Sequence, residues 1–313
     1  MVPRGGRVVK REPASRPVSY EPKDDSVLAF AVPKLDLRGR IVRLGPAVNE
    51  ILTNYPYPDP VARALGEGVA LTALLGSIMT RRDRFQLQTR SDGAIDLLIV
   101  DYDPPGRLRG FARYDKGGET PVGGPAELLG HGHMALTIEN PEADTRHQGV
   151  VALEGEGLAF AAFEYFRQSE QIPSFLRLAV GEVLGPQGRS WRAGGLLLQF
   201  LPRGGALVGE TDDVPDSWNE GVALASTIAD HELVDPSLSA ERVLYRLFHE
   251  RGVTVETARP LEAGCRCSDE RVENMLRSFS PQDRADMVGD DGRIVVTCEF
   301  CNKRRVYDPA ELD

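Results

Sequence analysis

The sequence predicts an α+β fold: a mostly antiparallel-sheet core domain with helices, then a helical linker, then a small C-terminal domain. Three observations predict it. Strand patterns come in blocks with few helices between them, which is typical of antiparallel sheets. The composition changes near residue 211, where an acidic, proline-containing stretch begins. All four cysteines of the chain lie within its last fifty residues.

Length, charge and hydropathy exclude several classes of protein. A chain of 313 residues, 41% of them hydrophobic, is long enough for two domains or for one large domain with an appendage. The formal net charge of −10 argues against nucleic acid as the main partner, because binding phosphates requires a basic surface. The longest nearly apolar run, residues 69–79, is too short to span a membrane, and no signal-peptide segment follows the N-terminus. We therefore expect a cytoplasmic protein with reduced thiols and no membrane partner.

The chain begins with a basic tail, residues 1–22, in which arginine and lysine are interspersed with proline; this composition predicts disorder. The core domain is expected over residues 23–210. Its first elements are a buried strand at 27–32, a half-buried strand at 39–44, a short helix at 47–52 and a longer helix at 60–80. Apolar residues nearly encircle the longer helix, which is typical of a core helix.

The rest of the core domain is predicted to be mainly strands. Alternating apolar residues between turn signals predict strands at 85–89, 95–100, 108–114, 134–138 and 150–153. A helix at 158–170 and two strands, at 175–184 and 196–200, complete the domain.

Residues 211–262 are predicted to form the helical linker. A weakly patterned helix covers 218–229, and a second helix begins after the capping residue Ser239 and ends near Gly252. The apolar face of the second helix consists of Val243, Leu244, Leu247 and Phe248. In a soluble protein such a face has to be covered by another surface.

The C-terminal domain is expected over residues 263–313. Ser268 and Ser280, the latter followed by a proline, are predicted to cap two short helices. A turn at 290–292 leads into a strand at 294–296, and the chain returns at 306–307 after a tight turn in which Asn302 is expected to be left-handed.

The cysteines form two close pairs, Cys265-x-Cys267 and Cys298-x-x-Cys301. Two such pairs on one short segment are what a tetrahedral sulfur site for one Zn²⁺ ion requires. A domain of this size with few large apolar residues is near the limit for folding alone, so zinc would supply the missing stability. Four sulfur ligands leave no position for a reactive water, so we expect no enzyme.

A zinc knuckle with a purely structural role is the simpler interpretation of the cysteines at this point. The tight Cys265-x-Cys267 half is the unusual feature, because structural ribbons more often use two Cys-x-x-Cys halves. Site interpretations of the other polar residues are weaker. His131 and His133 could be metal ligands, but without a third partner nearby they fit a surface loop better. Glu154 and Glu156 could act as an acid and base pair, although a solvated turn is the simpler interpretation.

The cysteine-bearing segment contains the motifs Cys265-Arg266-Cys267-Ser268, Glu270-Arg271, Gly292 and Cys298-Glu299-Phe300-Cys301-Asn302. In these motifs it resembles the heat shock protein 33 family, the redox-regulated chaperones also called 33 kDa chaperonins. Further similar segments lie at 37–40 (LRGR), 149–155 (GVVALEG), 165–173 (YFRQSEQIP), 193–199 (AGGLLLQ) and 244–250 (LYRLFHE). The similarity covers about residues 25–312 and leaves out the basic tail.

The resemblance implies an ATP-independent holdase that is an inactive monomer when reduced and zinc-bound. It further implies that oxidants convert the thiolates into two disulfides, Cys265–Cys267 and Cys298–Cys301, and that zinc then leaves. The C-terminal domain would unfold, the linker would become flexible, and the protein would dimerise and bind unfolding client proteins. The cysteine domain would thus be a zinc-binding redox switch.

The linker pattern fits this scheme. Its apolar face at Val243, Leu244, Leu247 and Phe248 must be covered in the inactive state and is a candidate client-binding surface once released. The alternative is a constitutive zinc-ribbon module that binds a protein or nucleic-acid partner, although the net charge counts against nucleic acid.

Overall fold

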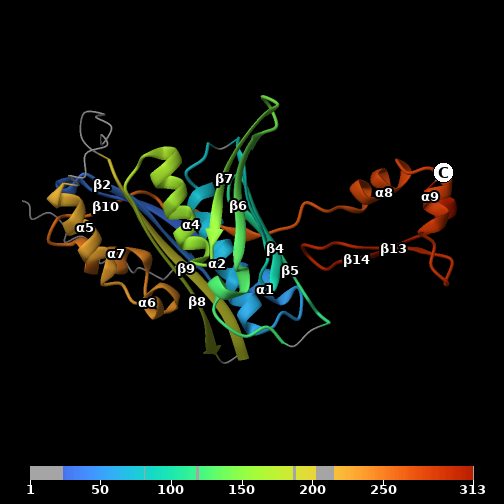
Figure 1. Cartoon of the computed structure of the whole chain (residues 1–313), viewed down its shortest axis with the longest axis horizontal. Coiled ribbons are helices and arrows are strands. Elements are labelled where there is room, and N and C mark those ends of the chain that lie inside the picture. The colour runs from blue at the N-terminus through green and yellow to red at the C-terminus, as the bar shows by residue number, and fades with distance from the viewer. Residues whose placement is uncertain (1–23, 81, 118–119, 186–187, 202–214, 313) are drawn as a thin grey trace, which may run out of the picture.

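The computed structural model describes residues 24–80, 82–117, 120–185, 188–201 and 215–312 (Figure 1). The predicted basic tail, residues 1–22, and the first residues of the predicted linker, 211–214, lie outside this part of the chain. No helix within the described part combines the length and the hydropathy needed to cross a membrane.

The first sheet contains four long strands and two short ones. Its order is β10-β1-β2-β9-β8, with β11 also paired to β1, and every pairing is antiparallel. The strands are β1 (Ser26–Val32), β2 (Leu37–Leu44), β8 (Ser174–Gly185), β9 (Gly188–Phe200), β10 (Thr254–Val255) and β11 (Arg259–Pro260).

The second sheet has the order β12-β5-β4-β3-β6-β7. Its strands are β3 (Arg84–Ser91), β4 (Ile95–Asp103), β5 (Arg107–Tyr114), β6 (His131–Asn140), β7 (Thr145–Glu154) and β12 (Glu262–Ala263). Only the short pairing of β12 with β5 is parallel. The predicted α+β class with mostly antiparallel sheet is therefore confirmed.

The larger hydrophobic core lies between the two sheets and is filled by helices. These are α1 (Pro46–Thr53), α2 (Asp59–Gly76) and α4 (Gly157–Tyr165), with the short helix α3 (Pro125–Leu129) nearby. Almost every residue of α2 from Val61 onward is buried, which confirms the prediction of a core helix. A π-helical turn, Phe166–Glu170, follows α4 and takes the place of the end of the predicted helix at 158–170.

A second core covers the other face of the first sheet. Helices α5 (Asp216–Ser226), α6 (Asp230–Val234) and α7 (Ala240–Phe248) pack against β1, β2 and β9 there. Ser239 caps α7 by accepting a hydrogen bond from the Arg242 N–H, as predicted. The molecule is therefore layered, and these helices lie on the side opposite the C-terminal lobe (Figure 1).

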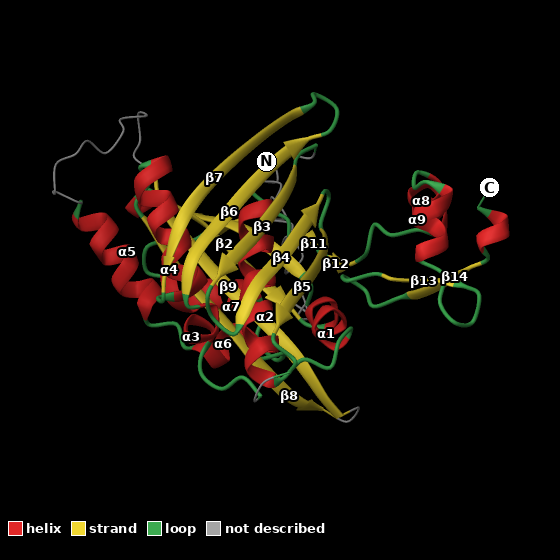
Figure 2. Ribbon diagram, turned by 45° about the vertical axis from the view of Figure 1, so that its right-hand side comes forward, coloured by secondary structure: helices red, strands yellow, loops and turns green. Residues whose placement is uncertain are grey.

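The C-terminal lobe stands apart from the layers (Figure 2). It contains α8 (Asp269–Arg277), α9 (Pro281–Asp286), β13 (Ile294–Thr297), β14 (Arg304–Tyr307) and a 3₁₀ turn (Pro309–Glu311). Ser268 and Ser280 cap the two helices, and Asn302 has φ 55°, as predicted. The buried apolar core of the described lobe consists only of Leu276, Ile294 and Leu312. Such a small core contributes little stability.

Several elements differ from the sequence prediction. Strand β9 begins at Gly188, whereas the sequence pattern predicts its start at 196. The pattern misses the first half of the strand because that half carries glycine and arginine instead of alternating apolar residues. Gly194 is required there, since a Cβ would lie 2.5 Å from the Leu233 carbonyl oxygen of α6. The sequence pattern does not predict β10 and β11, which lie within the predicted linker, or β12, which spans its boundary with the C-terminal domain. They are too short to leave a periodic pattern.

Candidate metal centre

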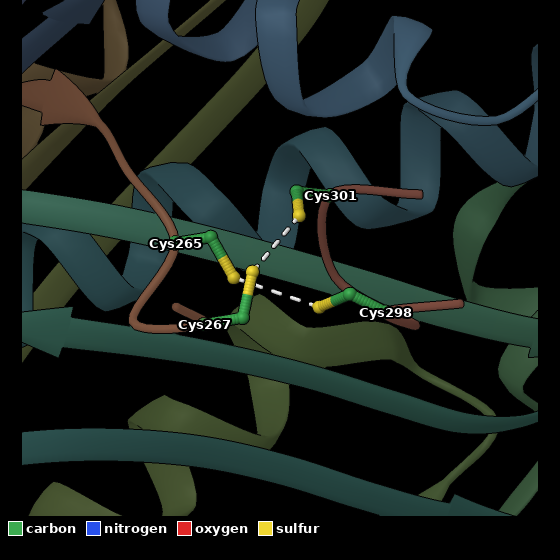
Figure 3. A group of neighbouring side chains, drawn as sticks. All are labelled: Cys265, Cys267, Cys298 and Cys301. Carbon is green, nitrogen blue, oxygen red and sulfur yellow. Dashed lines mark hydrogen bonds between the residues drawn. The ribbon is translucent and has the colours of Figure 1, made fainter. Parts of the chain in front are cut away.

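Two loops bring the four cysteines together. Cys265 and Cys267 follow β12, while Cys298 and Cys301 lie on the turn between β13 and β14 (Figure 3). The four sulfur atoms all lie within 4.8 Å of one another. Two contacts join the two loops: 3.6 Å from Cys265 Sγ to Cys298 Sγ, and 3.4 Å from Cys267 Sγ to Cys301 Sγ.

The spacing of the sulfurs fits a tetrahedral metal ion. A zinc–sulfur bond of about 2.3 Å in a regular tetrahedron places the sulfurs about 3.8 Å apart. The observed contacts are close to this value, and thiolates are the ligands that soft or borderline metals prefer. The four cysteines can therefore hold a metal ion, and as a set of four they would fill its coordination sphere.

The turn that carries Cys298 and Cys301 is shaped by its own main chain. The Asn302 N–H donates to the Cys298 carbonyl oxygen at 2.8 Å, and the Cys298 N–H donates to the Lys303 carbonyl oxygen. The left-handed Asn302 closes the turn before β14 begins. This geometry aims both sulfurs at the other loop (Figure 3).

The thiols of the cluster ionise unequally. Burial raises the pKa of Cys301 to about 12. At Cys265 burial acts in the same direction, but the Cys267 N–H, the neighbouring thiols and Arg109 outweigh it and lower the pKa to about 7. Each further thiolate is repelled by those already formed. A divalent cation at the centre removes that repulsion, which is why such a cluster favours a metal.

Two arginines supply positive charge beside the sulfurs. Arg305 of β14 is buried, and its Nη2 lies 3.4 Å from Cys267 Sγ while its Nε binds Asp269. Arg109 of β5 places Nη1 3.8 Å from Cys265 Sγ. Four thiolates around a dication would carry excess negative charge, and these guanidinium groups would offset part of it. The sequence analysis did not identify either arginine, because each is distant along the chain from the cysteine that it contacts. Arg109 is 156 positions from Cys265, and Arg305 is 38 positions from Cys267.

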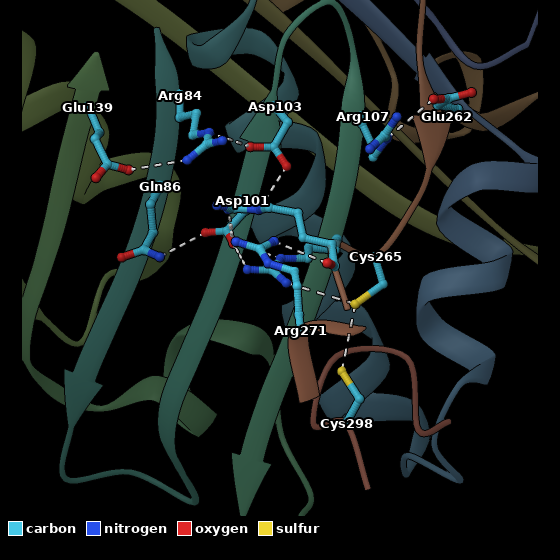
Figure 4. A network of polar contacts seen from close by, with 12 residues as sticks. Arg84, Gln86, Asp101, Asp103, Arg107, Glu139, Glu262, Cys265, Arg271 and Cys298 are labelled. Atoms are coloured by element: carbon cyan, nitrogen blue, oxygen red, sulfur yellow. Dashed lines mark hydrogen bonds and ion pairs between the residues drawn. The ribbon is translucent and has the colours of Figure 1, made fainter. Parts of the chain in front are cut away.

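A buried ion-pair network attaches the cluster to the second sheet (Figure 4). Arg266, between the first two cysteines, binds Asp101 through Nη2 at 2.6 Å and lies 2.8 Å from Asp103 through Nε. The second contact is an ion pair without hydrogen-bond geometry. Asp101 is almost wholly buried and is also bound by Arg109 and by the Gln86 amide. The spacing of residues in the sequence contains no signal of this network.

The predicted client-binding residues lie far from the cysteines. Val243, Leu244, Leu247 and Phe248 of α7 are all buried against the first sheet, and the Phe248 ring stacks on Phe30 with centroids 5.8 Å apart. The first sheet thus provides the covering surface that the linker pattern requires.

The other polar candidates do not form sites in the described part of the chain. His131 and His133 lie in strand β6, not in a loop, because this polar end of the strand pairs with both β3 and β7. Their side chains are exposed and belong to no described cluster of three or more metal-binding groups. Glu154 and Glu156 are exposed at the end of β7 and before α4, which agrees with a solvated turn.

Comparison with known proteins finds one family along nearly the whole chain. A family model described as "Hsp33 protein" matches residues 25–308. The chain is 44% identical over 292 residues to the 33 kDa chaperonin of Caulobacter vibrioides, covering 91% of this chain and 95% of that one. It is 37% identical to the 33 kDa chaperonin of Pseudomonas syringae pv. tomato, covering 93% of each.

A solved structure has the same fold. The crystal structure of the 33 kDa chaperonin (heat shock protein 33 homolog) from Thermotoga maritima superposes with a TM-score of 0.73 at 21% identity. The match covers 92% of this chain and 96% of that one. The fold of nearly the whole chain is thus found in another protein.

Proposed function

This chain belongs to the Hsp33 family, and from that premise we propose that it is a redox-regulated, ATP-independent holdase chaperone. The observation that carries the proposal is the cluster of four sulfurs in a lobe whose described apolar core has only three buried residues. Such a lobe would depend on a metal ion held by the four cysteines for its folding. A chemical change at the sulfurs would therefore change the fold.

Zinc is the proposed metal. Cys265, Cys267, Cys298 and Cys301 would hold one Zn²⁺ as thiolates, and the bound ion would supply folding free energy that the small core of the lobe lacks. With four sulfur ligands the centre has no open position, and the two relatives compared above are named chaperonins rather than enzymes. We therefore propose no catalytic role.

Oxidation of the thiolates would operate the switch. We propose the disulfides Cys265–Cys267 and Cys298–Cys301. Each forms as two thiolates give up two electrons, which one peroxide molecule accepts together with two protons to become two waters. In the folded lobe, close sulfur contacts join the two loops, from Cys265 to Cys298 and from Cys267 to Cys301. Near-neighbour disulfides would replace these links and leave the loops separate, which favours opening of the lobe.

Strand pairing offers a path from the lobe to the linker. β12 leads directly into Cys265 and pairs with β5, while β11 and β10 pair with β1. These three strands connect the cysteines to α7. When the lobe unfolds, they would lose their anchor, and α7 would be free to expose Val243, Leu244, Leu247 and Phe248. We propose that this face binds unfolded client proteins.

The remaining parts of the proposal follow the family resemblance. The reduced protein would be a monomer, the oxidised protein a homodimer, and both would act in the cytoplasm without nucleic acid or membrane as partner. The division into tail (1–22), core (23–210), linker (211–262) and redox-switch domain (263–313) is part of the same proposal.

One titration tests the function. Hydrogen peroxide is added to the zinc-loaded chain while released zinc is followed with a chromogenic chelator and client aggregation by light scattering. We expect one zinc per chain to leave, aggregation to be suppressed in proportion, and dithiothreitol with zinc to reverse both. A sample kept in dithiothreitol is the control, and mass spectrometry should find the two near-neighbour disulfides.

Two results would contradict the proposal. Zinc release without suppression of aggregation would exclude the chaperone function. Equal binding by the reduced, zinc-loaded chain would instead indicate the alternative, a constitutive zinc-ribbon module. Disulfides between the two loops would overturn only the proposed pairing.

A further inference from the structure

The cysteine turn at residues 298–302 is seated on the core by hydrogen bonds to the end of α1. The Tyr55 hydroxyl donates to the Cys298 carbonyl oxygen at 3.1 Å, and the Asn54 amide donates to the Phe300 carbonyl oxygen at 3.3 Å. The Asn302 amide returns a bond to the Asn54 carbonyl oxygen at 2.8 Å. Two of these three contacts recognise main-chain carbonyl groups of the turn, which every polypeptide possesses.

The same surface holds the aromatic side chain of the turn. The guanidinium carbon of Arg109 lies 3.9 Å from the centroid of the Phe300 ring, within the range of a strong cation–π contact. Arg109 is fixed in this position by its ion pair with the buried Asp101. Beside it, the rings of Tyr55 and Phe111 pack edge to face with centroids 5.7 Å apart.

The surface belongs to the core and not to the lobe. Asn54 and Tyr55 follow α1, and Arg109 and Phe111 lie on β5, whose long pairing is with β4. The main-chain hydrogen bonds between β4 and β5 do not involve the cysteines, although the Arg109 and Tyr55 side chains contact Cys265 and Cys298. If the lobe unfolds, the surface therefore persists with its hydrogen-bond donors and aromatic rings uncovered.

We propose that this core surface, formed by Asn54, Tyr55, Arg109 and Phe111, is a client-binding site that the 298–302 turn occupies in the folded lobe. The inference rests on the proposed chaperone function and deepens it. The partner it fits is an extended segment of an unfolded polypeptide with one aromatic side chain and free main-chain carbonyl groups. Folded proteins pair nearly all their buried carbonyl groups and bury most aromatic rings, so the site selects unfolded chains.

The proposal predicts effects of opposite sign in the two redox states. Replacing Tyr55 removes a contact that holds the turn, so the reduced Tyr55→Ala chain should release zinc at a lower peroxide dose. The same change removes part of the client site, so the oxidised chain should bind clients less tightly. A residue that only docks the lobe would show the first effect without the second.

The experiment measures both states of the full chain. Zinc release is followed during peroxide titration, and the affinity of the oxidised, zinc-free chain is measured by fluorescence anisotropy with labelled, reduced and carboxymethylated α-lactalbumin, a permanently unfolded probe. We expect Tyr55→Ala to weaken binding about tenfold, which corresponds to about 1.4 kcal/mol. Asn54→Ala should act in the same direction, and zinc content before oxidation verifies that each variant is folded.

Phe163→Ala is the matched control, because Phe163 is a partly exposed aromatic residue on α4, elsewhere on the core. It should change neither quantity. Unchanged probe affinity in both Tyr55→Ala and Asn54→Ala would overturn the site while leaving the chaperone function intact. Failure of the oxidised wild-type chain to bind the probe would overturn the chaperone function and the site with it.

Discussion

Arg266 lies between two cysteines, yet its guanidinium group contacts the core sheet. Its partners Asp101 and Asp103 also have arginine neighbours within the core, Arg109 and Arg84 respectively. Removal of Arg266 therefore leaves each carboxylate with one cation. The lobe can therefore detach from the core without leaving a buried carboxylate unpaired, which makes a reversible attachment energetically reasonable.

We predict that Arg266→Met loosens the lobe from the core while the metal centre stays intact. In the reduced, zinc-loaded chain, hydrogen exchange should become about tenfold faster at the Glu262 and Gly264 amides, which bond Gly106 and Leu108. Protection within β13 and β14 should not change, because their hydrogen bonds lie within the lobe.

A matched control is Arg293→Met, which removes an exposed ion pair with Asp308 inside the lobe. Exposed pairs of this kind contribute little, so exchange at Glu262 and Gly264 should stay as in the wild type. Loss of zinc in Arg266→Met, or unchanged exchange at both amides, would contradict the attachment role.

At the level of the element, α7 combines a good cap with one fully apolar face. Leu244 is completely buried against the first sheet, whereas Tyr245, the next residue, is 64% exposed. A helix of nine residues is too short to be stable alone, so its packing on the sheet determines whether it forms.

We predict that Leu244→Ala destabilises the docked helix by about 2–5 kcal/mol, the usual range for removing a buried leucine side chain. Hydrogen exchange of the α7 amides in the reduced chain should accelerate, as measured by mass spectrometry. Tyr245→Ala is the control and should leave that exchange nearly unchanged. Equal acceleration in both variants would mean that packing on the sheet does not hold the helix.

Periodic elements were predictable from the sequence and contact-dependent ones were not. The core helix α2, the capped helices α7, α8 and α9, and the left-handed Asn302 carry local signals, and the structure confirms them. Strand β12 has two residues and exists only because β5 lies beside it.

The candidate site shows the same division. The four cysteines share a local spacing, so the sequence alone suggested that they meet. Arg109 reaches Cys265 across 156 positions of the chain, and Tyr55 reaches Cys298 across 243. Such contacts are fixed by the packing of the layers, and a single sequence gives no sign of them.

For the whole molecule, the layer order separates the two ends of the proposed switch. The linker helices cover the outer face of the first sheet, and the cysteine lobe contacts the second sheet (Figures 1 and 2). Only the stretch with β10, β11 and β12 joins them along the chain, and it contacts both sheets. A change at the sulfurs can therefore reach α7 without rearranging the large core.

We predict that the association state follows the redox state. Sedimentation equilibrium should give a monomer for the reduced, zinc-loaded chain and a dimer after peroxide removes zinc, because the apolar face of α7 then needs a new partner. Removal of zinc by a chelator under reducing conditions is an instructive control. A chain that remains monomeric after oxidation at micromolar concentration would contradict the proposed dimer.

The pairing of β10, β11 and β12 has one more consequence. Beyond them, in the described part of the chain, β1 and β5 have no further strand beside them, so these short strands cover part of one edge of each sheet, while β8 and β7 form the other edges. If they detach, the main-chain groups that they pair on β1 and at the start of β5 face solvent as well. An extended polypeptide of any sequence can add itself there as a new strand. The stretch that connects linker and lobe thus also reduces the length of sheet edge to which another chain can add.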